Sequence, residues 1–294
     1  MKRQFGFTLI ELMISLALGI AISWVVLDVS LNAMRNNGDI VATGDVIEKG
    51  IYLGDLLKRE IKHAGFYGRI TSDNVVIAPD SPQTDLCTTT PTKRHLTTPV
   101  FGLNNKTSLC TDIDLLNGSD VLMIRRASTT LALNLVPAQH YIQSNFDNVI
   151  LATGAAANFT LTEMDDTTPA PIHEFYQDVY YVDSDNNFKR RRLVNGAIVD
   201  EPLIEGVDDF QLQYGIDKNA DNIADTFTGI PASDNYSDWQ NVKTVTVSLL
   251  ISGETVSQTD AKKYNYADQT NRAFSDSKKR RLFSFVVAVG NQYQ

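Results

Sequence analysis

An apolar run near the N-terminus constrains this chain more than any other feature. Residues 7–29 form a run of 23 residues that is almost unbroken in its apolar character. As an α-helix it would be about 35 Å long, enough to cross a bilayer core of about 30 Å. Lys2 and Arg3 precede the run, and this positive charge favours a cytoplasmic position for that end. The sequence therefore predicts a transmembrane helix over residues 7–29.

Two simpler readings of the run are a secretory signal peptide and a plain membrane anchor. A signal peptide has a shorter apolar core followed by a small-residue cleavage site, whereas this run ends in Trp24-Val25-Val26-Leu27. A plain anchor leaves Glu11 unexplained, because a carboxylate in hydrocarbon is costly unless it is paired. No Lys or Arg occurs between Phe7 and Met34. A cation for Glu11 must therefore come from another molecule, or from a new α-amino group made by cleavage nearby.

The start of the run carries a recognisable motif. The segment Gly6-Phe7-Thr8-Leu9-Ile10-Glu11-Leu12 resembles the class III signal of type IV prepilins and type II secretion pseudopilins. The resemblance implies that a prepilin peptidase removes residues 1–6 by cutting after Gly6, and methylates the new N-terminal Phe7. It also implies that Glu11 pairs with the N-terminal amine of a neighbouring subunit.

A second helical pattern follows the apolar run, and we expect an amphipathic half of the same helix over residues 30–68. Gly50 and Gly54 lie on its inner side, where a missing side chain would let a sheet approach closely. We expect the helix to end near Gly65. The apolar residues expected to face the core fall on one arc of about 120°; they are Ile40, Ile47, Ile51, Leu57 and Ile61.

Beyond Gly68 the apolar period changes to two, which is typical of strands with one wet face. The turn at 183–187, with the sequence Asp-Ser-Asp-Asn-Asn, predicts a hairpin. One helix followed by many antiparallel strands indicates an α+β fold with a β-rich head over residues 69–294. The expected strands are Asp120–Arg125, Val179–Val182, Phe188–Leu193, Phe210–Tyr214, Val242–Ile251 and Leu282–Val289.

Several segments of the chain resemble the minor pilins of the PilW type, which are related to J-type pseudopilins of type II secretion. These segments are 57–68, 118–122 and 206–215. The resemblance implies a structural subunit that helps to initiate the type IV pilus and lies near its tip. A type II secretion pseudopilin remains an alternative. So does an adhesin or ligand-binding head carried on the pilus, which would use loops 79–117 or 162–173.

The same resemblance implies a location and a set of partners. The protein would lie in the bacterial inner membrane with its head in the periplasm, and later in the pilus at the cell surface. Its partners would be other minor pilins, the major pilin, the prepilin peptidase and the inner-membrane assembly platform. A tip adhesin is a further possible partner.

The chain has two cysteines, Cys87 and Cys110, with 22 residues between them. Outside the inner membrane, such a pair in a loop-rich stretch is expected to form a disulfide. By the loop-closure relation this link would stabilise the fold by roughly 3 kcal/mol. Zinc is not expected, because His95 is the lone soft ligand between the two cysteines.

One loop has the oxygen spacing of a calcium site. In the segment 217–225, side-chain oxygens stand at the first, third, fifth and ninth positions, which are Asp217, Asn219, Asp221 and Asp225. Ca²⁺ takes several oxygens at about 2.3–2.6 Å. Against this reading, Asn222 stands where glycine usually permits the sharp turn, and no bidentate Glu follows. The alternative is an Asn- and Asp-rich turn between strands.

Charge and motifs disfavour nucleic-acid binding and catalysis. The formal net charge is −9, and it becomes 24 − 35 = −11 once Lys2 and Arg3 are removed, whereas general nucleic-acid binders are usually basic. Two basic clusters, 189–192 and 278–281, are expected to be solvated faces and edge protection. The chain lacks Gly-x-Ser-x-Gly, His-Glu-x-x-His and any phosphate-cradling loop. We therefore predict no catalytic residues and no required cofactor.

Overall fold

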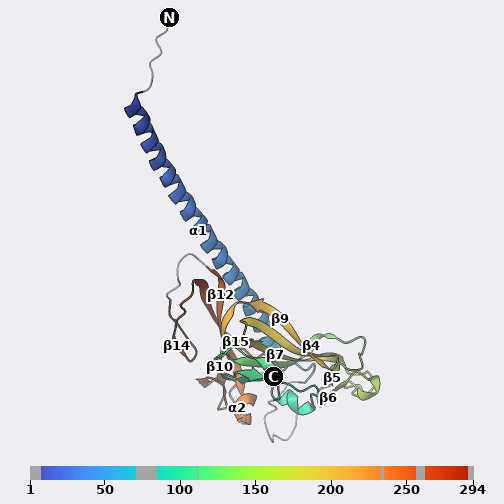
Figure 1. Cartoon of the computed structure of the whole chain (residues 1–294). Coiled ribbons are helices and arrows are strands. Elements are labelled where there is room, and N and C mark those ends of the chain that lie inside the picture. The colour runs from blue at the N-terminus through green and yellow to red at the C-terminus, as the bar shows by residue number, and fades with distance from the viewer. Residues whose placement is uncertain (1–7, 71–84, 111, 233–234, 256–261, 291–294) are drawn as a thin grey trace.

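The computed structural model describes residues 8–70, 85–110, 112–232, 235–255 and 262–290. A long helix, α1 (Leu9–His63), enters a β-rich head with its C-terminal half and projects away from that head with its N-terminal half (Figure 1). At 55 residues it spans about 80 Å. The fold is α+β, as the sequence predicted.

The second half of α1 is helical because it buries one face against the head. Its buried residues are Ala42, Val46, Gly50, Leu53, Gly54, Leu56, Leu57, Glu60 and Ile61. The helix ends at its C-cap, Ala64, and Gly65 follows with a positive φ of 77°. The predicted end near Gly65 is therefore confirmed, and the left-handed conformation explains why glycine stands there.

The predicted core stripe of α1 is partly wrong. Leu57 and Ile61 are fully buried, but Ile40 and Ile51 are 69% and 57% exposed. The reason is the close contact at Gly50, where an added Cβ would lie 2.2 Å from the Phe283 ring. Because this contact turns the Gly50 side of the helix toward the sheet, Ile51, one residue and about 100° further round, faces outward.

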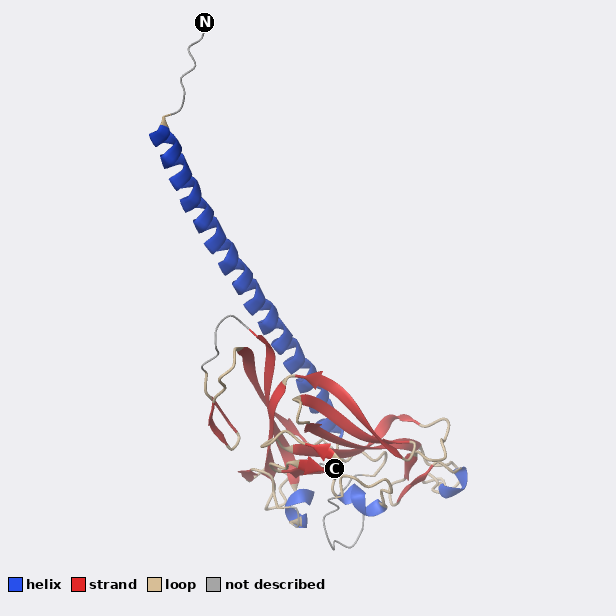
Figure 2. Cartoon of the chain, viewed as in Figure 1, coloured by secondary structure: helices blue, strands red, loops and turns tan. Residues whose placement is uncertain are grey.

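Two antiparallel sheets make up the head (Figure 2). In the larger sheet the order is β1-β4-β7-β5-β6, and β8 and β9 extend it from the C-terminal part of β7. Its strands are β1 (Val100–Leu103), β4 (Val121–Leu131), β5 (His140–Ser144), β6 (Val149–Thr153), β7 (Ile172–Val182), β8 (Asn187–Val194) and β9 (Ala197–Glu205).

The second sheet has the order β11-β10-β12-β15 and packs directly on α1 (Figure 1). Its strands are β10 (Val207–Ile216), β11 (Thr226–Thr228), β12 (Val242–Thr255) and β15 (Lys278–Ala288). Every strand expected from the sequence lies within or overlaps one of these strands or those of the larger sheet. The shorter elements are β2 (Ser108–Leu109), β3 (Ile113–Asp114), β13 (Tyr264–Tyr266), β14 (Gln269–Arg272), α2 (Tyr236–Gln240), and the 3-10 turns η2 (Lys93–Thr97) and η3 (Ala156–Asn158).

One hydrophobic core joins α1 to both sheets. Alternate residues of β12 are fully buried in it, as the period of two predicts; they are Val245, Val247, Leu249 and Ile251. Trp239 of α2 closes the core against Phe101 and Tyr214, with ring centroids 4.5 and 5.1 Å away. Asp120 also connects the sheets, because its carboxylate accepts the backbone N–H of Leu212 in β10 at 2.8 Å. The head is thus one packed unit fixed to α1.

Candidate membrane and assembly site

The first half of α1 presents apolar side chains outward in every direction. From Leu9 to Leu31 each large apolar side chain is between 45% and 77% exposed. Among the helices of the described residues, α1 is long and apolar enough to cross a membrane. Its most apolar segment has a mean hydropathy of 2.3. An apolar surface of this extent must be covered by lipid or by other helices.

Glu11 lies on the first turn of this exposed helix and takes part in a capping box with Thr8. Its carboxylate accepts the Thr8 backbone N–H and the Thr8 hydroxyl, both at 3.3 Å. The Glu11 backbone N–H donates in turn to the Thr8 hydroxyl oxygen at 3.2 Å. This arrangement gives the carboxylate hydrogen bonds but no opposite charge.

Sequence reasoning missed Thr8 as a partner for Glu11, although the signal was present. A Ser or Thr followed three residues later by Glu is the capping-box pattern, and Thr8-Leu9-Ile10-Glu11 has it. The predicted cleavage residue Gly6 and the predicted N-terminal residue Phe7 lie outside the described residues. Their roles stay predictions.

The far end of α1 is fixed to the larger sheet by a buried ion pair. The carboxylate of Glu60 accepts from the Arg126 guanidinium of β4 at 2.7 Å, and both side chains are largely buried. The Arg126 guanidinium also lies 4.9 Å from the centroid of the Tyr176 ring. Losing one partner would leave a buried charge unpaired, which is strongly destabilising, so this contact holds the helix end firmly in the head.

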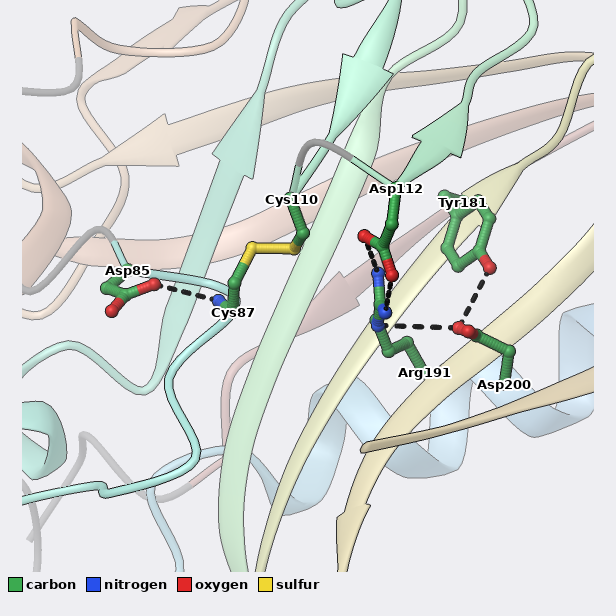
Figure 3. The surroundings of a disulfide bond; sticks show 7 residues. All are labelled: Asp85, Cys87, Cys110, Asp112, Tyr181, Arg191 and Asp200. Atoms are coloured by element: carbon green, nitrogen blue, oxygen red, sulfur yellow. Dashed lines mark hydrogen bonds and ion pairs between the residues drawn. A yellow bond between two sulfur atoms is a disulfide. The ribbon is translucent and has the colours of Figure 1, made fainter. Parts of the chain in front are cut away.

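Cys87 and Cys110 form the disulfide that the sequence predicted, with a Cα–Cα distance of 5.6 Å (Figure 3). The bond ties the segment before η2 to the end of β2. Asp112 lies just beyond it and receives two hydrogen bonds from Arg191, at 3.0 and 2.6 Å. These bonds lower the pKa of the Asp112 carboxyl below its usual range. The ion pair attaches the β2–β3 hairpin to β8, and the disulfide attaches it to the segment before η2.

The basic cluster at 189–192 is not the solvated face that was expected. Each of its cations pairs with a carboxylate on a neighbouring segment, and Arg191 is only 6% exposed. The reason is the sheet register, which places β8 between the acidic residues of β7 and β9. The pairs are Lys189 with Asp183, Arg190 with Glu201, Arg191 with Asp112 and Asp200, and Arg192 with Asp178. A cluster neutralised in this way has little charge left for nucleic acid.

The predicted calcium loop connects β10 and β11 and is largely exposed, except for Asp217, which is buried. Asn219 lies between two of its carboxylates, 3.2 Å from Asp221 and 3.3 Å from Asp225. The Asp217 carboxylate accepts three backbone N–H groups of the loop, at 2.7 to 3.1 Å, and these bonds contribute to a lowered pKa for Asp217. Among the described residues, no three His, Cys, Asp or Glu side chains are grouped so as to hold a metal. Calcium binding therefore stays a prediction.

Sequence comparisons match two parts of the chain to family models. Residues 1–27 match the family described as "Prokaryotic N-terminal methylation motif", and residues 179–291 match "Type IV Pilus-assembly protein W" (PilW). The second match runs from β7 to beyond β15 and so covers the sheet that packs on α1. A search of curated proteins found no match.

A search of solved structures matches the type IV-like pilin TTHA1219 from Thermus thermophilus. The alignment covers 84% of this chain and 97% of that one, with 11% identity and a TM-score of 0.42. Pilins are in general structural and not enzymatic. The methylation motif, the exposed apolar half of α1 and the PilW match agree in order along the chain. The chain is therefore a type IV pilin-like protein whose C-terminal part, residues 179–291, is similar to PilW.

Proposed function

We propose that this pilin helps to initiate assembly of the type IV pilus and lies near the tip of the fibre. The observation that carries the proposal is the shape of the molecule: one exposed apolar half-helix bears a broad head that spreads well to the side of α1 (Figure 1). A subunit at the tip has neighbours below it and none above. A broad head therefore fits at the tip without having to repeat along the shaft.

The driving force for joining the fibre is the free-energy cost of the unpaired Glu11 carboxylate in lipid. In the single subunit, Thr8 supplies hydrogen bonds to the carboxylate but no positive charge. The amine of a neighbouring subunit, made by cleavage after Gly6, would supply that charge. Because an ionised group in hydrocarbon is costly until it is paired, association of the apolar helices is favoured over a lone subunit.

The remaining partners follow from the same scheme. Before assembly the apolar half of α1 lies in the inner membrane, with the head on the periplasmic side, where a disulfide such as Cys87–Cys110 persists. The prepilin peptidase processes the N-terminus, and the assembly platform in the inner membrane receives the subunit. Other minor pilins and the major pilin then form its neighbours.

Immunogold labelling of sheared pili tests the tip position. An epitope inserted after Met164, whose side chain is 83% exposed, would be labelled in a strain carrying the tagged chain at its own locus. Gold particles confined to fibre ends are the expected result. Regular labelling along the shaft would contradict the tip position, and a tagged major pilin serves as the control for shaft labelling.

A further inference from the structure

A positively charged groove runs along α1 beside β15. At its membrane-side end, a cavity of about 260 Å³ is lined by Thr43 and Val46 of α1 and by four cations, which are Lys262, Lys279, Arg280 and Arg281. A second cavity, of about 320 Å³, continues along the helix and shares Arg281. Its other lining residues include Gly50, Ile51, Gly54, Asp55 and Lys58 of α1. We call the two cavities together the basic groove.

The described residues neutralise the charge of the groove only in part. Arg280 pairs with Asp208 and Asp276 and is buried. Lys279 and Arg281 form no ion pair with any carboxylate of the described residues, and the Arg281 guanidinium instead lies 5.7 Å from the centroid of the Phe283 ring. In a protein of net charge −9, this is a local excess of positive charge that favours a negatively charged occupant.

The wall of the second cavity is the outer edge of β15. Five consecutive residues, Arg281 to Phe285, line it, and β15 is the last strand in the order of its sheet. Within the described residues that edge has no neighbouring strand, and such an edge presents backbone N–H and C=O groups that are not paired with another strand. Ile51 adds an apolar spot, since it is 57% exposed in the same cavity. These features fit an extended peptide segment.

The position of the groove along α1 argues against a lipid headgroup as the occupant. Thr43 lies 14 residues beyond Val29, the end of the apolar run, which is about 21 Å along the helix. The headgroup layer on one side of a bilayer is only about 5–8 Å thick. The basic groove thus lies beyond the lipid headgroups, at the level of the β-rich head.

We propose that the basic groove binds an extended, acidic segment of a neighbouring pilin subunit. Carboxylates of that segment pair with Lys279 and Arg281, and its backbone lies along the β15 edge. The proposal rests on the role of this chain as a pilus subunit and names the surface by which the head contacts its neighbour.

Site-specific photo-cross-linking in piliated cells tests the proposal. The full-length chain would carry a benzophenone side chain in place of Thr43, which lines the groove and is half-buried. After irradiation we expect an adduct with another pilin, with the cross-linked peptide rich in Asp or Glu. Lys279→Glu combined with Arg281→Glu should reduce the adduct about fivefold or more, because two attractive contacts become repulsive.

A matched charge change on another face controls for net charge. Lys93→Glu combined with Lys106→Glu alters the net charge by the same amount on elements that do not line the groove, and it should leave the adduct unchanged. Reversing the acidic residues of the partner peptide to Lys should restore the adduct in the Lys279→Glu and Arg281→Glu background. Restoration would show pairing where loss alone could reflect misfolding.

Three results would overturn the proposal: an adduct unaffected by the charge reversal in the groove, an adduct to phospholipid, or an adduct formed within one chain. The adduct is scored in membranes as well as in fibres. The chain could cross-link to another pilin and yet be dispensable for piliation. That result would refute the proposed role in initiation but would still support binding of a pilin segment in the basic groove.

Discussion

At the residue scale, the proposed assembly depends most on Glu11. The structure shows that Thr8 satisfies part of its hydrogen-bonding capacity, so the carboxylate can exist in an unassembled subunit. What it lacks is an opposite charge. The hydrogen bonds from Thr8 could be predicted from the capping-box pattern in the sequence. The missing opposite charge could be predicted from the lack of Lys and Arg between Phe7 and Met34.

Replacing Glu11 with Ala should lower the amount of this chain in sheared pili, because the charge that favours association is lost. The measurement is an immunoblot of sheared fibres normalised to the chain in the membrane. Ser15→Ala, one turn further along α1, serves as the control, because it removes a hydroxyl that bonds only the Glu11 carbonyl. Equal recovery of the two variants would count against the role given to Glu11.

Asp120 makes the stability of the head depend on pH. Burial raises the pKa of its carboxyl to about 7, against the ordinary value of 3.8, although the Leu212 and Asn105 N–H groups oppose this shift. The folded protein therefore holds this proton more tightly than the unfolded chain. Stability from this group is fully present below about pH 4 and is lost as pH rises toward 7.

The comparison of wild type with Asp120→Asn isolates this effect. Between pH 5 and pH 7 the wild type should lose about 2 kcal/mol of unfolding free energy relative to the variant. Urea unfolding in detergent at the two pH values measures the difference, and contributions from other groups cancel. Parallel pH profiles for the two proteins would show that Asp120 keeps an ordinary pKa.

The loop at 217–225 should respond to calcium if its four oxygen-bearing side chains turn inward together. At a Ca²⁺ concentration 100 times the dissociation constant, binding would add about 2.7 kcal/mol of stability, and Asp221→Ala should remove that gain. Asp147→Ala, at an exposed turn elsewhere, is the control. A melting temperature that stays constant up to millimolar Ca²⁺ would rule the site out.

At the scale of elements, the contact between α1 and β15 depends on two glycines that are not equivalent. A Cβ on Gly50 would lie 2.2 Å from the Phe283 ring, whereas one on Gly54 would lie 3.6 Å from Phe285, an ordinary contact. Since β15 also borders the basic groove, the same contact sets the position of the groove beside the helix.

Gly50→Ala should destabilise the head by about 1–3 kcal/mol, because the Phe283 ring must leave its packed position. Gly54→Ala should be neutral, or stabilising by up to about 1 kcal/mol through helix propensity. Denaturant unfolding of both variants in detergent provides the test. Equal destabilisation by the two substitutions would mean that the helix does not approach the sheet in this way.

Much of this element order could be predicted from the sequence. The apolar run, the change from helical to alternating spacing, and the hairpin at 183–187 each follow from local patterns. Strand β9 was missed, although Asn195-Gly196 between β8 and β9 has two positive φ values and is a strong hairpin signal. Strands β5 and β6 are only five residues each, too short for an alternating pattern to stand out.

The features that could not be predicted depend on register and on contacts between distant elements. The ion pairs of 189–192 follow from which residues of β7 and β9 lie opposite β8, and the sequence of β8 alone does not fix this. The outward position of Ile51 follows from one ring on β15 that meets Gly50. The basic groove likewise exists only because β15 lies against α1.

At the scale of the whole molecule, the structure separates two tasks. In the proposed function the exposed half of α1 serves insertion and association, while the disulfide-bonded head presents surfaces to neighbouring subunits. Because the head is one packed unit fixed to the helix by Glu60 and Arg126, the direction of α1 would determine which face of the head meets a neighbouring subunit in the proposed fibre.

The central claim is that this chain is a pilus subunit needed to start the fibre. Its most direct test is a count of surface pili by electron microscopy in a clean deletion strain and in the same strain complemented with the wild-type chain. We predict that pili are lost on deletion and return on complementation. Unchanged pilus numbers in the deletion strain would contradict the account, and a secretion defect in that strain would point to a pseudopilin instead.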